Sequence, residues 1–218
     1  MVGFLSRHNF SNRDYFSGET YLRTFDHYTI IDKVYTTKYG ICMELNYVFH
    51  IILTNHHIPN YLVKCHKKKS NGDFYDLFHL AIIVELDGSK YFIDVGFGEH
   101  FIEPVELNHN SITGNIKVIF NQLENTNIST YDISTNNMNN SVLILRVTDK
   151  PLNNIKHIES NYQKFFHSKP EEFPLCRVLF ERKFDAKTNQ YIPLVPDYQY
   201  IKKSKLLALK YSNQFNLT

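Results

Sequence analysis

The sequence predicts an α+β fold in one compact body, because the spacing of apolar residues changes twice along the chain. After Gly40 the apolar residues recur about every 3.6 residues, as on one face of a helix. From Tyr61 onwards they alternate with a period of two, which is typical of strands. A helical pattern returns after Lys150-Pro151. The three expected parts are a helical part at 1–57, a β-rich part at 58–150 and a mixed α/β part at 151–218.

Three helices are expected. The first is a weak pattern over residues 21–34. The second begins at Cys42 and ends near His56-His57, as histidines in a last turn and the following Pro59 favour. The third runs from about 153 to 167, with aromatic and branched residues on one side.

The strands are expected in the middle part, with one more near the C-terminal end. Their positions are about 61–66, 78–86, 90–95, 115–120, 142–147 and 175–180. The Asn-, Ser- and Thr-rich stretch 121–140 is expected to be a surface loop or weak edge strands.

Composition excludes several classes of protein. A formal charge of +2 over 218 residues without a concentrated basic face argues against a nucleic-acid binder. The chain shows neither a signal peptide nor an apolar run long enough to span a membrane. Cys42, Cys65 and Cys176 are an odd, irregular set that suits a reducing compartment, so a cytoplasmic protein is expected. His56, His57, Cys65 and His66 lack zinc-type spacing, and no metal site is predicted.

The strongest local prediction is a β-hairpin with Asp87-Gly88 at its turn. Asp-Gly between two β-rich runs is the expected type I′ turn, in which both positions need positive φ. Opposed residues then have numbers that sum to 175, and Glu85 faces Lys90, a favourable cross-strand pair. In this register His79 lies diagonal to Asp94 on one face, at about 7–8 Å between backbones. The hairpin therefore predicts a histidine–aspartate pair.

Cys42 is expected at the N-terminus of a helix, directly after a turn that contains Gly40. The partial positive charge of a helix N-terminus favours the thiolate, which is the nucleophilic form of cysteine. A single cysteine on a helix face is more often a packing residue. Together with His79 and Asp94, however, it makes a candidate nucleophile, base and orienting acid.

These segments resemble the arylamine N-acetyltransferases. The nucleophile motif of that family, Arg-Gly-Gly-x-Cys-x-Glu-x-Asn, is similar to Lys38-Tyr39-Gly40-Ile41-Cys42-Met43-Glu44-Leu45-Asn46. Its histidine precedes an apolar strand, as His79 does, and its aspartate begins a segment similar to Asp94-Val95-Gly96-Phe97-Gly98. The resemblance covers roughly residues 28–185.

The resemblance implies an arylamine N-acetyltransferase-like fold with a cysteine-peptidase-like core, in which a β-barrel middle follows the helical part and an abbreviated α/β lid ends the chain. It implies a triad of Cys42, His79 and Asp94. It further implies acetyl-CoA as co-substrate, no permanently bound cofactor, and an arylamine, hydrazine or N-hydroxyarylamine as acceptor, the last as in N-hydroxyarylamine O-acetyltransferases. Phe97 and Gly98 are expected near the acceptor. The oligomeric state is not predicted.

The departures from the motif keep other functions open. Lys38 and Tyr39 stand where the family has arginine and glycine, so a contact from residue 38 to Glu44 would be weaker, and the ring of Tyr39 is expected to narrow access to the cleft. The run Lys67–Lys69 is either a solvated loop or a steering site for CoA phosphates. The alternatives are a cysteine amidohydrolase or transglutaminase-like peptidase, and a catalytically weak binding protein on the same scaffold.

Overall fold

The computed structural model describes residues 1–17, 24–69, 71–108, 110–122, 129–137 and 140–195. The helices are α1 (Val2–Leu5), α2 (Arg13–Ser17), α3 (His27–Thr37), α4 (Cys42–Asn55), α5 (Ile155–His167) and the 3-10 helix η2 (Pro174–Cys176). The strands are β1 (Asn9–Ser11), β2 (Tyr39–Gly40), β3 (Asn60–His66), β4 (His79–Leu86), β5 (Ser89–Ile93), β6 (Val105–Glu106), β7 (Ile112–Thr113), β8 (Ile116–Gln122), β9 (Ser129–Asn137), β10 (Asn140–Thr148), β11 (Glu181–Asp185) and β12 (Gln190–Pro193).

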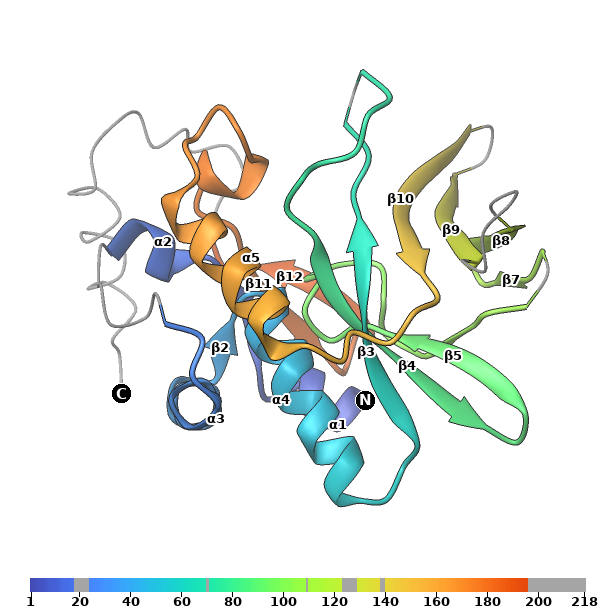
Figure 1. Cartoon of the computed structure of the whole chain (residues 1–218), viewed down its shortest axis with the longest axis horizontal. Helices are drawn as coiled ribbons and strands as arrows, with labels where there is room; N and C mark the ends of the chain where they lie inside the picture. Colours follow the sequence, from blue (N-terminus) through green and yellow to red (C-terminus); the bar gives the residue numbers. More distant parts are fainter. Residues whose placement is uncertain (18–23, 70, 109, 123–128, 138–139, 196–218) are drawn as a thin grey trace.

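The fold is α+β, as predicted, and its strands form two sheets. The larger sheet is antiparallel, with the order β6-β5-β4-β3-β10-β9-β8-β7, and it forms a barrel-like part on the right-hand side of Figure 1. The smaller sheet has the order β12-β11-β1-β2. It joins strands from both ends of the chain, since β1 pairs with β11 and with β2. None of the described helices is long and apolar enough to cross a bilayer.

The two faces of strands β3 to β5 pack against different cores. Leu80, Ile82 and Ile93 belong to a core shared with α3, α4 and α5. Ala81 and Ile83 belong to a second core, shared with β8, β9 and β10. Side chains of a strand alternate between its faces, so the period of two in the sequence produces this division. Helix α4 lies on the first face, where it packs against β4 and β3 (Figure 1).

The β4–β5 hairpin has the predicted register. Asp87 and Gly88 have φ of 51° and 79°, as a type I′ turn requires. The ladder pairs Ile82 with Ile93 and Glu85 with Lys90, so the residue numbers sum to 175.

The stretch 121–140 contains a strand that the sequence analysis placed at most at an edge. Strand β9 lies between β8 and β10 in the sheet order, so it is an interior strand. Its buried residues include Tyr131 and Ile133, and between them Asp132 forms an ion pair with Arg146 of the neighbouring strand at 2.7 Å. Buried and outward-facing residues do alternate in β9, but the many Asn, Ser and Thr residues around them make this alternation hard to recognise in the sequence. Residues 123–128 and 138–139 lie outside the described residues.

The predicted strand at 175–180 is wrong. The apolar run begins in η2, and no ladder pairs its backbone among the described residues. Instead the buried side chain of Asn12 donates to the carbonyl oxygens of Leu175 and Val178, at 2.6 and 2.8 Å, and accepts from the N–H of Phe180 at 2.7 Å. Because one asparagine satisfies these groups, the segment needs no neighbouring strand.

Two predicted elements are shifted or fall partly outside the described residues. The weak helix expected at 21–34 corresponds to α3, which begins at His27 after Asp26 caps the N–H of Thr29 at 2.9 Å. Residues 18–23 lie outside the described residues, as do residues 196–218 of the expected C-terminal part.

Candidate active site

Cys42 is the first residue of α4 and lies at its N-terminal end. Ile41 precedes it in an extended conformation, with φ of −83° and ψ of 171°, and the Glu44 carboxylate accepts the Ile41 N–H at 2.9 Å. This half of a capping box fixes the first turn of the helix. The cysteine is 8% exposed, so its thiol is enclosed and still reachable.

His79 and Asp94 form the pair that the hairpin register predicted. His79 begins β4, and Asp94 follows the last residue of β5. The Nε2 atom of His79 lies 2.5 Å from Oδ2 of Asp94, whose side chain is fully buried. Cys42 lines the same cavity as His79 and interacts with its imidazole, so the three predicted residues form one contiguous set.

The electrostatics of the set favour a charged imidazole. Burial lowers the pKa of His79, but the charges and hydrogen bonds of Asp94 and Cys42 outweigh it and raise the pKa to about 10. An imidazolium next to a sulfur atom favours the thiolate over the thiol. A protonated His79 beside the Cys42 sulfur is therefore an arrangement from which a cysteine can act as a nucleophile.

Asn46 connects the nucleophile helix to the hairpin, and the sequence analysis did not assign it a role. Its Nδ2 atom donates to Oδ1 of Asp94 and to the carbonyl of Leu80, both at 2.8 Å. Its Oδ1 atom accepts the N–H of Val95 at 2.9 Å. Asn46 is four residues after Cys42 and so shares its helix face. That spacing, within the matched motif, is the signal that could have identified it.

Gly96 allows the hairpin to touch α4 directly. A Cβ atom at Gly96 would lie 2.6 Å from the Cα of Cys42 and 2.9 Å from Nδ2 of Asn46. The Gly96 N–H donates to Oδ1 of Asp94 at 2.9 Å, which gives this carboxylate another fixed partner. A side chain at residue 96 would therefore separate the cysteine from its histidine.

A cavity of about 220 Å³ adjoins Cys42 and His79. Its walls are mostly apolar, and they include Phe10, Ile41, Phe78, Phe97, Leu175 and Phe180. The ring of Phe97 is edge-on to His79 at a centroid distance of 5.3 Å. Gly98 has φ of 80° and packs behind this wall, where a Cβ atom would lie 3.1 Å from the Phe10 side chain.

Tyr39 does not project into this cavity, contrary to the expectation from the sequence. It is absent from the cavity wall, and its hydroxyl donates to Oδ1 of Asp14 at 2.9 Å. Its ring also lies under the guanidinium of Arg13, at 4.5 Å. Lys38 makes no contact with Glu44, because its Nζ atom lies over the exposed ring of Tyr35 at 4.3 Å.

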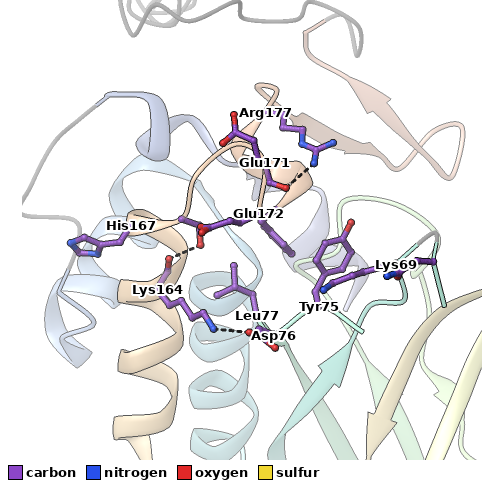
Figure 2. Close-up of a pocket in the computed structure, with 12 residues that line it drawn as sticks. Lys69, Tyr75, Asp76, Leu77, Lys164, His167, Glu171, Glu172 and Arg177 are labelled. Carbon is purple, nitrogen blue, oxygen red and sulfur yellow. Dashed lines mark hydrogen bonds and ion pairs between the residues drawn. The ribbon is translucent and has the colours of Figure 1, made fainter. Parts of the chain in front are cut away.

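A second, polar cavity of about 630 Å³ lies beside the first (Figure 2). Leu77 and Phe173 contribute to both cavities. Figure 2 shows Lys164 directed at Asp76, 3.3 Å away, and Arg177 directed at the backbone oxygen of Glu171. Of the lysine run Lys67–Lys69, Lys67 lines the first cavity and Lys69 lines the second. Among the described residues, no group of three His, Cys, Asp or Glu side chains could hold a metal ion.

The comparison with protein families decides the identity of the fold. The model of the N-acetyltransferase family matches residues 4–182. The chain belongs to the arylamine N-acetyltransferase family. An uncharacterized acetyltransferase of Acanthamoeba polyphaga mimivirus is 97% identical over 204 residues, which cover 94% of each chain. A second uncharacterized acetyltransferase of the same virus is 44% identical over 193 residues, covering 88% of this chain and 92% of the relative.

Solved structures of other members have the same fold at low identity. Arylamine N-acetyltransferase C of Bacillus anthracis has a TM-score of 0.73 at 16% identity, over 88% of this chain and 75% of its own. The Mycobacterium smegmatis enzyme has a TM-score of 0.71 at 14% identity, over 100% of this chain and 83% of its own. The Mycobacterium marinum enzyme, solved in complex with CoA, has a TM-score of 0.66 at 13% identity, over 85% of this chain and 69% of its own. This acetyltransferase thus has the family fold, which these three structures match over 85–100% of the chain.

Proposed function

We propose that this acetyltransferase moves an acetyl group from acetyl-CoA to an aromatic amine through an acetyl-cysteine intermediate on Cys42. The observation that carries the proposal is the contiguous set of Cys42, His79 and Asp94 at an apolar cavity. In this assignment Cys42 is the nucleophile, His79 the acid and base, and Asp94 the group that orients the imidazole. Acetyl-CoA is a co-substrate that leaves as CoA.

In the first half-reaction the Cys42 thiolate attacks the thioester carbonyl of acetyl-CoA. The bond from carbon to the CoA sulfur breaks, and the His79 imidazolium gives its proton to the departing CoA thiolate. The N–H of Cys42 stands in the first turn of α4, where backbone N–H groups have no acceptor within the helix. It is a suitable donor to the oxyanion that forms on the carbonyl oxygen.

In the second half-reaction the acceptor nitrogen attacks the acetyl-cysteine carbonyl. The neutral imidazole of His79 takes the proton from that nitrogen, and the Cys42 thiolate leaves. Acetylation removes the charge on Cys42, which is one of the causes that raise the pKa of His79. The same histidine is therefore a better base in the acetylated enzyme than in the free one.

The cavity beside Cys42 suits a small aromatic acceptor. Its volume of about 220 Å³ is smaller than the range of about 300–1,000 Å³ that is usual for drug-sized ligands. It can hold one aromatic ring with an amine, a hydrazine or an N-hydroxylamine group, or else the acetyl end of the donor. A cavity of this size fits a reaction in which donor and acceptor occupy it one after the other, with CoA released in between.

The deciding experiment is incubation with acetyl-CoA in the absence of an acceptor, followed by intact-mass measurement and peptide mapping. We expect one acetyl group on Cys42, and its loss when an arylamine is added. Cys42→Ala removes the adduct, while Cys176→Ala, which changes a buried thiol away from the cavity, retains it. Absence of an adduct together with cleavage of amides indicates a cysteine amidohydrolase instead. Inertness in both assays indicates a binding protein.

A further inference from the structure

A buried ionic cluster lies behind the first turn of α4. The Nζ atom of Lys33 lies 2.6 and 2.7 Å from the two carboxylate oxygens of Glu44, and it forms a second ion pair with Asp14. Tyr162 donates to Oε1 of Glu44 at 2.7 Å, and Tyr39 donates to the carboxylate of Asp14. The cluster therefore joins four helices and one short strand, namely α2, α3, β2, α4 and α5.

The lysine in this cluster is charged. Lys33 is 7% exposed, and Asp14 and Glu44 are 4% and 0% exposed. Burial lowers the pKa of Lys33, but the charges and hydrogen bonds of the two carboxylates outweigh it and raise the pKa. Removing one partner of a buried ion pair leaves the other charge uncompensated and is strongly destabilising, so Lys33 and its two carboxylates act as one unit.

The cluster reaches the nucleophile through the helix cap. The same Glu44 carboxylate that binds Lys33 accepts the N–H of Ile41, the residue before Cys42. Gly40 leaves room for this carboxylate, because a Cβ atom there would lie 2.8 Å from Oε2 of Glu44. Residues two apart on a helix point in different directions, so the cluster supports the turn without occupying the side that carries the sulfur.

We propose that Lys33 is a positioning residue for the nucleophile: its ion pair with Glu44 holds the first turn of α4 so that Cys42 faces His79. The motif in the sequence suggested Lys38 for such a contact, but that side chain lies on the surface over Tyr35. The supporting cation comes instead from α3, five residues earlier. The inference concerns the site of the proposed function, and its main readout requires neither acetyl-CoA nor an acceptor.

The first test compares Lys33→Met with Lys38→Met. Both replace a lysine by an unbranched neutral side chain, and only the first lies in the cluster. The readout is the rate constant for alkylation of Cys42 by iodoacetamide at pH 7, located by peptide mass, in protein that circular dichroism shows to be folded. We expect a fall of about tenfold to a hundredfold for Lys33→Met, since a misplacement of about 1 Å can cost up to about a hundredfold in rate. Lys38→Met should change the rate less than about twofold.

A second pair remains informative if Lys33→Met does not fold. Asp14→Asn and Glu44→Gln each neutralise one carboxylate and leave one ion pair with Lys33. The two variants differ because only Glu44 is hydrogen-bonded to the turn that carries Cys42. A glutamine at residue 44 has one oxygen to accept from Lys33, the Ile41 N–H and Tyr162, where glutamate has two. A role in stability alone would lower the Tm in both without affecting the alkylation rate of folded protein. Positioning predicts at least a tenfold slower alkylation in Glu44→Gln than in Asp14→Asn.

Equal alkylation rates in the carboxylate pair, or an unchanged rate in folded Lys33→Met, would overturn the proposal. Its failure is distinguishable from failure of the proposed function. If the native protein is not acetylated by acetyl-CoA but its alkylation depends on Lys33, the positioning role stands and the transfer reaction does not. If acetylation occurs, Lys33→Met should lower the rate of acetyl-cysteine formation and leave the KM for acetyl-CoA nearly unchanged.

Discussion

Gly96→Ala tests whether direct contact between hairpin and helix sets the geometry of the site. The added methyl carbon would lie 2.6 Å from the Cα of Cys42, whereas carbon atoms pack at about 3.5–4.0 Å. Hairpin and helix must then separate by about 1 Å. Overpacking of this kind costs about 1–3 kcal/mol. In a chain of 218 residues each kcal/mol lowers the Tm by about 2–4 °C, so we expect a fall of about 2–12 °C.

The same separation should slow the chemistry of Cys42 more than it lowers stability. A displacement of about 1 Å can reduce a rate about a hundredfold. The assay is alkylation of Cys42 by iodoacetamide, with acetylation by acetyl-CoA as a second readout, at a temperature well below the Tm. Gly3→Ala is the control, because a methyl group at that position meets no atom of the described chain within 4 Å beyond its own neighbours and helix backbone. If Gly96→Ala reacts like Gly3→Ala, the contact does not control the site.

Three further predictions follow from the site. Cys42→Ala should abolish acetyl transfer with little change in Tm, because it removes the nucleophile and only a small side chain; activity above background would contradict the mechanism. Asn46→Leu should lower the free energy of unfolding in urea by about 2–4 kcal/mol, since it leaves several buried polar groups without partners; a loss below about 1 kcal/mol would show that they find others. The pKa of His79 is raised to about 10, so its stabilising effect is complete below pH 6.5 and is lost as the pH rises to 10. The difference in Tm between native protein and His79→Gln should therefore narrow over that pH range, and a constant difference would refute the charged pair.

Local chemistry made the hairpin and its His–Asp pair predictable. Asp87-Gly88 permits one tight turn, and the alternation of apolar residues leaves one register in which both faces can be buried. The helix that begins at Cys42 followed from its apolar period and from the histidines and Pro59 at its end. In each case the interacting residues are near one another in sequence, so the pattern contains most of the information.

The cluster around Lys33 and the packing of 175–180 could not be predicted in the same way. Nothing near Lys33 in the sequence indicates that it is buried, because its partners lie on other elements and Glu44 is eleven residues away. Likewise, the backbone of 175–180 is satisfied by Asn12, more than 160 residues earlier. An apolar run predicts burial, but what pairs with its backbone is decided by the tertiary fold.

The attachment through Asn12 bears on how a substrate enters. Leu175, Val178 and Phe180 line the cavity beside Cys42, and three hydrogen bonds to one asparagine side chain hold their backbone. At about 1 kcal/mol each, these bonds hold the segment by about 3 kcal/mol. Because every 1.4 kcal/mol is a factor of ten, loss of these three bonds would make detachment of this wall about a hundredfold more frequent. Because this wall is one side of the cavity, the strength of its attachment bears on which acceptors of the proposed reaction can enter.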